Sequence, residues 1–120
     1  MTKEQMLKRT KAFALRVIKA VKALPNNDVA DVLGRQILRS GTSVGANYRA
    51  ACRAKSTSDF VNKLKIVEEE CDETLYWMEL LVESETYPLH RLEPLMQEAG
   101  EILAIIVSSL RTTRMRANAR

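Results

Sequence analysis

The sequence predicts an all-α fold, an antiparallel up-down-up-down four-helix bundle that forms one domain over residues 1–120. Three observations lead to this fold class. The chain has 120 residues, of which 46% are hydrophobic and 28% are charged, a composition typical of one soluble globular domain. Its apolar residues recur with a helical period almost throughout, and only 5% of its residues are aromatic. Three short breaks in that period divide the chain into four segments.

The first two helices are expected over residues 3–24 and 29–54. Pro25 ends the first, because the residue before a proline avoids the helical conformation, and residues 26–28 (Asn-Asn-Asp) suit a turn and an N-cap. The expected core stripes are Met6, Thr10, Phe13, Val17, Val21 and Leu24, and then Val29, Leu33, Ile37, Ser40, Val44, Asn47 and Ala51. Beside the second stripe lies a strip of glycines, which predicts close approach of another helix at Gly34, Gly41 and Gly45.

The last two helices are expected over residues 59–82 and 91–113. Ser56 with Asp59 resembles a capping box at the start of the third helix, and residues 83–90 form the next loop. The expected core stripes are Phe60, Leu64, Val67, Cys71, Leu75, Met78 and Val82, and then Leu92, Met96, Ala99, Leu103, Ile106 and Leu110. We expect residues 114–120 to be a frayed tail.

The net charge of +4 is unevenly distributed along the chain. Residues 1–65 carry a net charge of +10, residues 66–101 carry −10, and residues 102–120 carry +4. Such asymmetry favours either an anionic partner for the basic part or subunits that meet basic region to acidic region. Ordinary solvated helix faces are the alternative explanation.

The basic residues of the first two helices are candidates for a nucleic-acid-binding surface. They are Lys8, Lys11, Lys19, Lys22, Arg35, Arg39, Arg49 and Arg53. Side chains of this kind bind phosphates in a salt-sensitive way without reading sequence. Tyr48 is the only aromatic residue near them, so a duplex or structured RNA fits better than a single strand stacked on aromatic rings. The alternative is that these side chains are simply solvated.

Two further groups of residues are candidates for structural roles. Trp77 lies off the core stripe and predicts an oligomer interface with its neighbours Ile66, Glu73 and Leu80, unless the helix face is wide enough to close within one chain. Ser40 and Asn47 lie on the core stripe and predict a structural polar core. They would fix helix register or meet the Ser56–Asp59 turn, with ligand binding as the alternative.

The residue types present exclude most catalytic and metal chemistry. The single histidine, His90, lies in a loop, and Cys52 and Cys71 lack metal or redox spacing, so both are expected to be free and mainly structural. Residues 41–45 lack the lysine of a phosphate loop, and the glutamates at 68–70 point in three directions. We therefore expect no catalytic residue, no metal and no cofactor. Without an apolar span or a secretory signal, the expected location is the cytoplasm, away from membranes.

Several segments resemble the bacterial four-helix bundle protein family, also called the 23S rRNA-intervening-sequence protein family. They are residues 39–51 (RSGTSVGANYRAA), 58–60 (SDF), 63–70 (KLKIVEEE) and 75–81 (LYWMELL). The resemblance implies a four-helix subunit that assembles into a ring, commonly a pentamer, and brings no accepted catalytic residue. It also implies kinship with the accessory protein of diversity-generating retroelements, which binds nucleic acid and a reverse transcriptase. Some members carry an acid shortly after Asn47, whereas here Tyr48-Arg49-Ala50-Ala51 follows.

These observations lead to a main functional hypothesis and two rivals. The main hypothesis is a non-enzymatic homo-oligomer that binds RNA or DNA through its basic faces. The first rival is a structural or adaptor homo-oligomer that binds a protein partner such as a reverse transcriptase and no nucleic acid directly. The second is an enzyme with an unfamiliar site.

Overall fold

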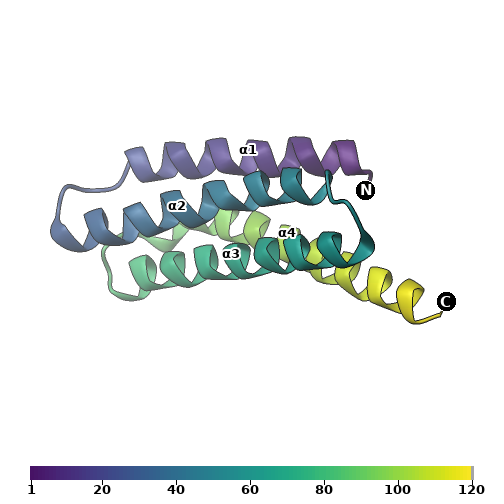
Figure 1. The fold of residues 1–120 in the computed structure, drawn as a ribbon. Coiled ribbons are helices and arrows are strands. Elements are labelled where there is room, and N and C mark those ends of the chain that lie inside the picture. Colours follow the sequence, from purple (N-terminus) through teal and green to yellow (C-terminus); the bar gives the residue numbers. More distant parts are fainter. Residues whose placement is uncertain (120) are drawn as a thin grey trace.

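The computed structural model describes residues 1–119 and is built from four helices. They are α1 (Lys3–Lys22), α2 (Asp28–Ala51), α3 (Thr57–Glu83) and α4 (Leu89–Asn118), and residues 1–119 contain no strand. Successive helices run antiparallel, and each is joined to the next by a short loop (Figure 1). The all-helical fold class and the order of the four helices are therefore confirmed.

Side-chain caps explain where the first three helices begin. Thr2 caps α1 in a capping box with Gln5, and the Asn27 side chain accepts a hydrogen bond from the Ala30 backbone N–H of α2. Ser56 caps α3 by accepting from the Asp59 backbone N–H at 3.0 Å, as the sequence predicts. The Asp59 carboxylate does not return to Ser56 but accepts from the Lys55 backbone N–H. Its hydrogen bond from Lys63 lowers the pKa of Asp59.

The expectation of a frayed C-terminal tail is wrong for residues 114–118. Helix α4 starts two residues earlier than expected and continues to Asn118. Its last turns pass alongside the first turns of α3, where Arg114 and Asn118 share a groove with Thr57 and Val61. Tertiary contact of this kind extends a helix that local sequence alone would leave frayed. Arg120 lies outside the described residues.

The four helices enclose one hydrophobic core along a bundle of 53 × 22 × 21 Å. Helix α2 packs against α1 and α3, and α4 packs closely against α3 but more sparsely against α1. In α1 the buried residues are Met6, Thr10, Phe13 and Val17, all of which belong to the predicted stripe. In the other three helices, part of the buried face is turned by about one residue from the predicted stripe. Ala30 and Gly34 replace Val29 and Leu33 in α2, Thr74 and Leu81 replace Leu75 and Val82 in α3, and Leu95 and Ile102 replace Met96 and Leu103 in α4.

The glycine strip of α2 lies against α1, as predicted. A Cβ added at Gly41 would lie 2.8 Å from a methyl carbon of Val17, and one at Gly45 would lie 3.2 Å from the backbone carbonyl oxygen of Thr10. Contacts this short show that α2 lies as close to the α1 backbone at Gly45, and to the Val17 side chain at Gly41, as glycine permits. This strip also explains the rotation at the start of α2, because Gly34 must face Leu24 and so moves Val29 to the surface.

Candidate functional site

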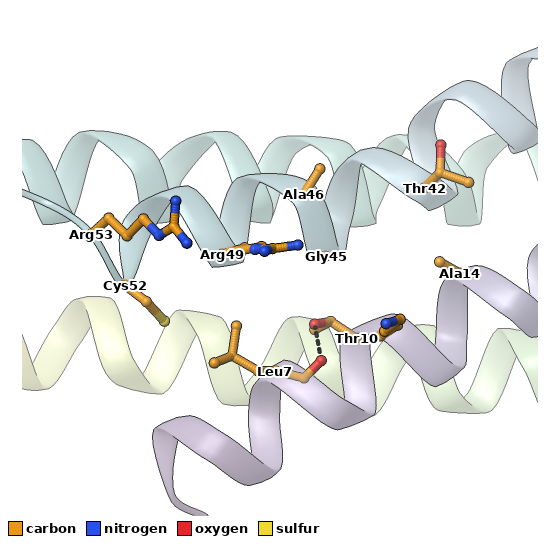
Figure 2. Close-up of a pocket in the computed structure, with 10 residues that line it drawn as sticks. Leu7, Thr10, Ala14, Thr42, Gly45, Ala46, Arg49, Cys52 and Arg53 are labelled. Carbon is orange, nitrogen blue, oxygen red and sulfur yellow. Dashed lines mark hydrogen bonds between the residues drawn. The ribbon is translucent and has the colours of Figure 1, made fainter.

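A groove between α1 and α2 gathers basic side chains from both helices. It has a volume of about 540 Å³ and opens between the N-terminal half of α1 and the C-terminal half of α2 (Figure 2). Its lining residues are Leu7, Thr10, Lys11 and Ala14 from α1, and Thr42, Gly45, Ala46, Arg49, Cys52 and Arg53 from α2 and the residues that follow it. The close α1–α2 packing at Gly45 forms its floor, and small side chains keep it open.

The groove carries positive charge without an acidic residue in its lining. Lys11, Arg49 and Arg53 border it, and none of the three forms an ion pair within the part of the chain that the structure describes. The hydroxyls of Thr10 and Thr42 donate to carbonyl oxygens of their own helices, at 2.9 Å and 2.7 Å. The free hydrogen-bond donors of the groove are therefore its cations, which suit an anionic ligand.

The lining offers no catalytic machinery. Cys52 is the one thiol in the groove, and no histidine or carboxylate borders the groove to activate it. Tyr48 is half-buried nearby, where burial, followed by the neighbouring Cys52, raises its pKa to about 12, so its phenol stays protonated at neutral pH. The lining therefore contains no side chain placed to activate the Cys52 thiol as a nucleophile.

The eight basic residues predicted to bind nucleic acid do not form one continuous surface. Lys11, Arg49 and Arg53 meet in the groove, and Lys8 is exposed on α1. Lys22 and Arg35 border a second groove at the other end of α1 and α2, together with Asp31. Lys19 lies beside Arg16 and Arg91, between α1 and α4.

Arg39 differs from the other seven because carboxylates of α3 neutralise it. Its guanidinium forms an ion pair with Glu70 at 3.2 Å and another with Glu73. The side chain is still half exposed, but its charge serves the α2–α3 contact.

Arg9, which the sequence did not single out, links α1 to α4 in a similar way. It binds Glu98 through two hydrogen bonds of 2.8 Å and 2.7 Å, and Glu101 at 3.1 Å. These contacts hold the pKa of Glu98 below its ordinary value. The only signal in the sequence was the basic residue itself, since its partners lie 89 and 92 residues away.

The predicted interface residues lie along the outer side of α3. Ile66 is 41% exposed and Leu80 is half-buried. Trp77 is also half-buried, packs against the core, and donates its indole N–H to Glu73 at 3.2 Å. Tyr76, which the sequence reasoning missed, is 53% exposed and meets the Trp77 ring edge-on. Trp77 and Glu73 are thus partly engaged within their own subunit, and the role of this face in assembly stays a prediction.

The two residues of the predicted polar core lie in different environments. Ser40 is fully buried, donates to the Gln36 carbonyl oxygen at 2.8 Å, and lies 2.8 Å from the Thr74 hydroxyl of α3. This contact joins α2 and α3 at one register. Asn47 is only half-buried and donates to the Ser43 carbonyl oxygen of its own helix, not to the Ser56–Asp59 turn.

Other chemistries have little support in the described residues. Among residues 1–119, no group of three His, Cys, Asp or Glu side chains lies close enough to hold a metal ion. Cys71 is buried, donates its thiol to the Ala99 carbonyl oxygen, and has a pKa raised to about 12 by burial. Over the same span, no helix is both long and apolar enough to cross a membrane.

Comparison with known proteins assigns the chain to one family. The model of the 23S rRNA-intervening sequence proteins matches residues 2–108. The chain belongs to this family. Its fold is similar to a crystal structure from Bacteroides thetaiotaomicron, described as a protein of unknown function from the S23 ribosomal protein family. The two are 38% identical with a TM-score of 0.85, over 92% of this chain and 99% of that one. No curated protein matches the chain.

Membership of the intervening-sequence family confirms the resemblance seen in the sequence, but it brings no activity. The similar structure has no stated function, so the groove and its charges are the features of this chain that bear on function. The family match ends at residue 108, whereas α4 continues for ten more residues.

Proposed function

We propose that this protein is non-enzymatic and binds RNA through phosphate contacts on the basic surface of α1 and α2. The observation that carries the proposal is the groove in which Lys11, Arg49 and Arg53 converge without an acidic residue or an internal ion pair. Like charges that lie this close repel one another, and an anionic ligand that binds between them offsets the repulsion. DNA presents the same phosphates and is the second possible ligand.

The binding we propose is directed at the nucleic-acid backbone. Arginine guanidinium groups bind phosphate oxygens through two parallel hydrogen bonds, and lysine adds a mobile point charge. No Asn or Gln side chain and no aromatic ring lines the groove, so it has neither amide groups to read adenine nor a stacking platform. Of the other predicted residues, Lys8 is exposed on α1 close to Lys11 in sequence and adds to the positive charge there. Lys19, Lys22 and Arg35 lie outside the groove, and Arg39 contributes less because Glu70 and Glu73 hold it.

We also propose that the subunit assembles with copies of itself, as a ring of five in the form that the family resemblance suggests. The outer side of α3 supports this idea, because Ile66 and Tyr76 remain exposed beside Trp77. Aromatic and aliphatic side chains of this kind concentrate at subunit interfaces.

The test is the affinity for a labelled RNA duplex, measured by fluorescence anisotropy from about 50 to 300 mM KCl. We expect binding that weakens steeply with salt and barely depends on sequence. The double variant Arg49→Glu, Arg53→Glu should bind at least about tenfold more weakly and lower the salt slope by about 2. The control variant Arg16→Glu, Arg91→Glu changes the net charge equally between α1 and α4, outside the groove, and should retain much more of the affinity.

The possible results separate the proposal from its rival. If the wild-type protein binds no RNA or DNA at 50 mM salt, the proposal is overturned. If the two double variants lose equal affinity for RNA, the groove is not the binding site. The rival is an adaptor that binds a protein partner such as a reverse transcriptase through the exposed α3 residues. In that case Tyr76→Ala would weaken partner binding while nucleic-acid affinity is absent.

A further inference from the structure

Folding sorts the charges of this chain by the ends of the bundle. Thr10 lies against Gly45, and Cys71 lies against Ala99, so the middle of the bundle passes near these residues. One end then comprises residues 1–12, 45–69 and 102–119, with 12 lysines and arginines against 4 acidic residues. The other comprises residues 13–44 and 70–101, with 6 against 11. We call the first the basic end, and both chain termini lie there (Figure 1).

The last turns of α4 project from the basic end. Figure 1 shows α4 continuing past the ends of the neighbouring helices, and its residues 109–118 lie beyond the family match. We call residues 109–118 the α4 arm. It carries Arg111, Arg114 and Arg116, all exposed, and none of them forms an ion pair within residues 1–119.

Two shallow grooves flank the α4 arm where it passes α3. Arg114 borders both of them. One, of about 520 Å³, is also lined by the polar side chains of Thr57, Ser58 and Asn62. The other, of about 280 Å³, contains Arg111 and one acidic residue, Glu68. Cations beside hydroxyl and amide groups form a surface that suits phosphate and sugar contacts.

The α2–α3 connection links the α1–α2 groove to the surroundings of the α4 arm. Arg53 lines the α1–α2 groove, and Thr57, four residues later, lines a groove beside the arm together with Arg114. Lys55 lies between Arg53 and Thr57 in the loop before α3 and is exposed. Helices α2 and α4 lie diagonally across the bundle, since they share no direct packing. A ligand that contacts both must therefore pass over α1, over α3, or across the end of the bundle, and the end is the route that Lys55 borders.

We propose that the α4 arm is a second phosphate-binding element and that one RNA duplex crosses the basic end from the α1–α2 groove to the arm. This inference rests on the proposed function and extends it to residues outside the family match. A duplex fits better than a single strand because the basic end has no exposed aromatic residue within the described chain. Tyr48 and Phe60 are half-buried there, and the exposed Tyr76 lies in the other half.

The experiment compares three charge-matched double variants in the duplex-binding assay. The arm variant is Arg114→Gln, Arg116→Gln, the groove variant is Arg49→Gln, Arg53→Gln, and the control at the other end is Arg16→Gln, Arg91→Gln. All six side chains are exposed, and glutamine is a good helix former, so circular dichroism should show folded protein in each case. We expect the arm variant to bind about fivefold to tenfold more weakly at 100 mM salt and to lower the salt slope by up to about 1.8, with the control within twofold of wild type.

The outcomes distinguish this inference from the proposed function. If the groove variant is weakened while the arm variant matches the control, the inference is overturned and the proposed function stands. If wild-type protein binds no duplex, both are overturned. A second assay measures binding to vesicles that contain anionic lipids. If the arm variant loses vesicle binding but keeps full duplex affinity, the α4 arm binds lipid and not RNA, which also overturns the inference.

Discussion

At the scale of single residues, the same side-chain chemistry serves different purposes according to what lies within 4 Å of it. Arg9 and Arg39 have carboxylates in reach and join helices, whereas Arg49 and Arg53 have none within the described chain and face a groove. The partner carboxylates come from helices distant in sequence. Sequence periodicity places an arginine on a helix face, but it does not say which residue of another helix lies opposite.

The ion pair between Arg9 and Glu98 leads to a prediction about pH. Hydrogen bonding to Arg9 holds the pKa of Glu98 below its ordinary value of 4.5. A carboxylate of this kind stabilises the fold fully above the unfolded pKa, and the stabilisation is lost as the pH falls through the lower folded pKa. We expect Glu98→Gln to lower the free energy of unfolding by about 1 kcal/mol at pH 7. The difference from wild type should shrink as the pH falls below about 4.5.

Urea unfolding at several pH values measures this effect. Glu101→Gln is the matched control, because Glu101 binds the same arginine but is 53% exposed against 18% for Glu98, and its loss should cost less. A difference between Glu98→Gln and wild type that stays constant from pH 7 to pH 3 would contradict the explanation.

At the scale of helices, the sequence predicts the elements well and their rotation less well. The four helices and the glycine contact follow from periodicity and from the absence of a Cβ, which are local properties. The rotation of α2 at Val29, of α3 at Leu81 and of α4 at Ile102 depends on which neighbour each helix meets. Leu75 and Leu103 lie at the edge of their apolar stripes and are half-buried against the core. How far such edge residues are buried depends on the position of the neighbouring helix, which the sequence pattern does not give.

The glycines of α2 and α4 lead to opposite predictions for the same substitution. In a helix interior, alanine is favoured over glycine by about 1 kcal/mol. At Gly100 nothing lies within 4 Å of the added methyl group, so Gly100→Ala should stabilise the protein by up to that amount. At Gly45 the methyl group would lie 3.2 Å from the Thr10 carbonyl oxygen, which cannot move without separating α1 from α2. Gly45→Ala should therefore destabilise it by about 1–3 kcal/mol.

Thermal and urea unfolding of the two alanine variants test this pair directly. Gly41→Ala should resemble Gly45→Ala, because its methyl group would meet the stiff Val17 side chain at 2.8 Å. If Gly45→Ala were as stabilising as Gly100→Ala, the α1–α2 contact would be looser than the structure describes.

At the scale of the whole molecule, the distribution of charge and of exposed apolar residues decides how the subunit meets other molecules. Division by sequence gives a basic first half and an acidic third quarter, but the antiparallel fold brings α3 and α2 side by side and redistributes those charges. The result is one basic end, while the exposed apolar residues of α3 lie outside the α1–α2 groove. Nucleic-acid binding and assembly therefore use different surfaces in our proposal.

Assembly is predicted to depend on the outer side of α3. We expect wild-type protein at micromolar concentration to sediment at about five times the subunit mass of 13.6 kDa. Ile66→Lys should shift it to smaller species, because a charge would be placed at the interface. Leu89→Lys is the control, since Leu89 at the start of α4 is 47% exposed and Ile66 is 41% exposed.

Analytical ultracentrifugation distinguishes the possible results, and the single tryptophan adds an independent signal. Dilution that dissociates the assembly should shift the fluorescence of Trp77 toward that of a more hydrated indole. A wild-type protein that sediments as one subunit would refute the assembly proposal. If Ile66→Lys and Leu89→Lys change sedimentation equally, the outer side of α3 is not the subunit interface.

The sequence by itself determined the four helices, the glycine contact and the family, because these depend on local periodicity, steric size and short sequence motifs. It also identified the basic residues of the first two helices as candidates for phosphate binding. Only the tertiary structure decided that Lys11, Arg49 and Arg53 share a groove, that Arg39 is neutralised, and that α4 stays helical to Asn118. The physical reason is that ion pairing, burial and the extension of a helix depend on groups brought together from distant parts of the chain, and those distances exist only once the helices are packed.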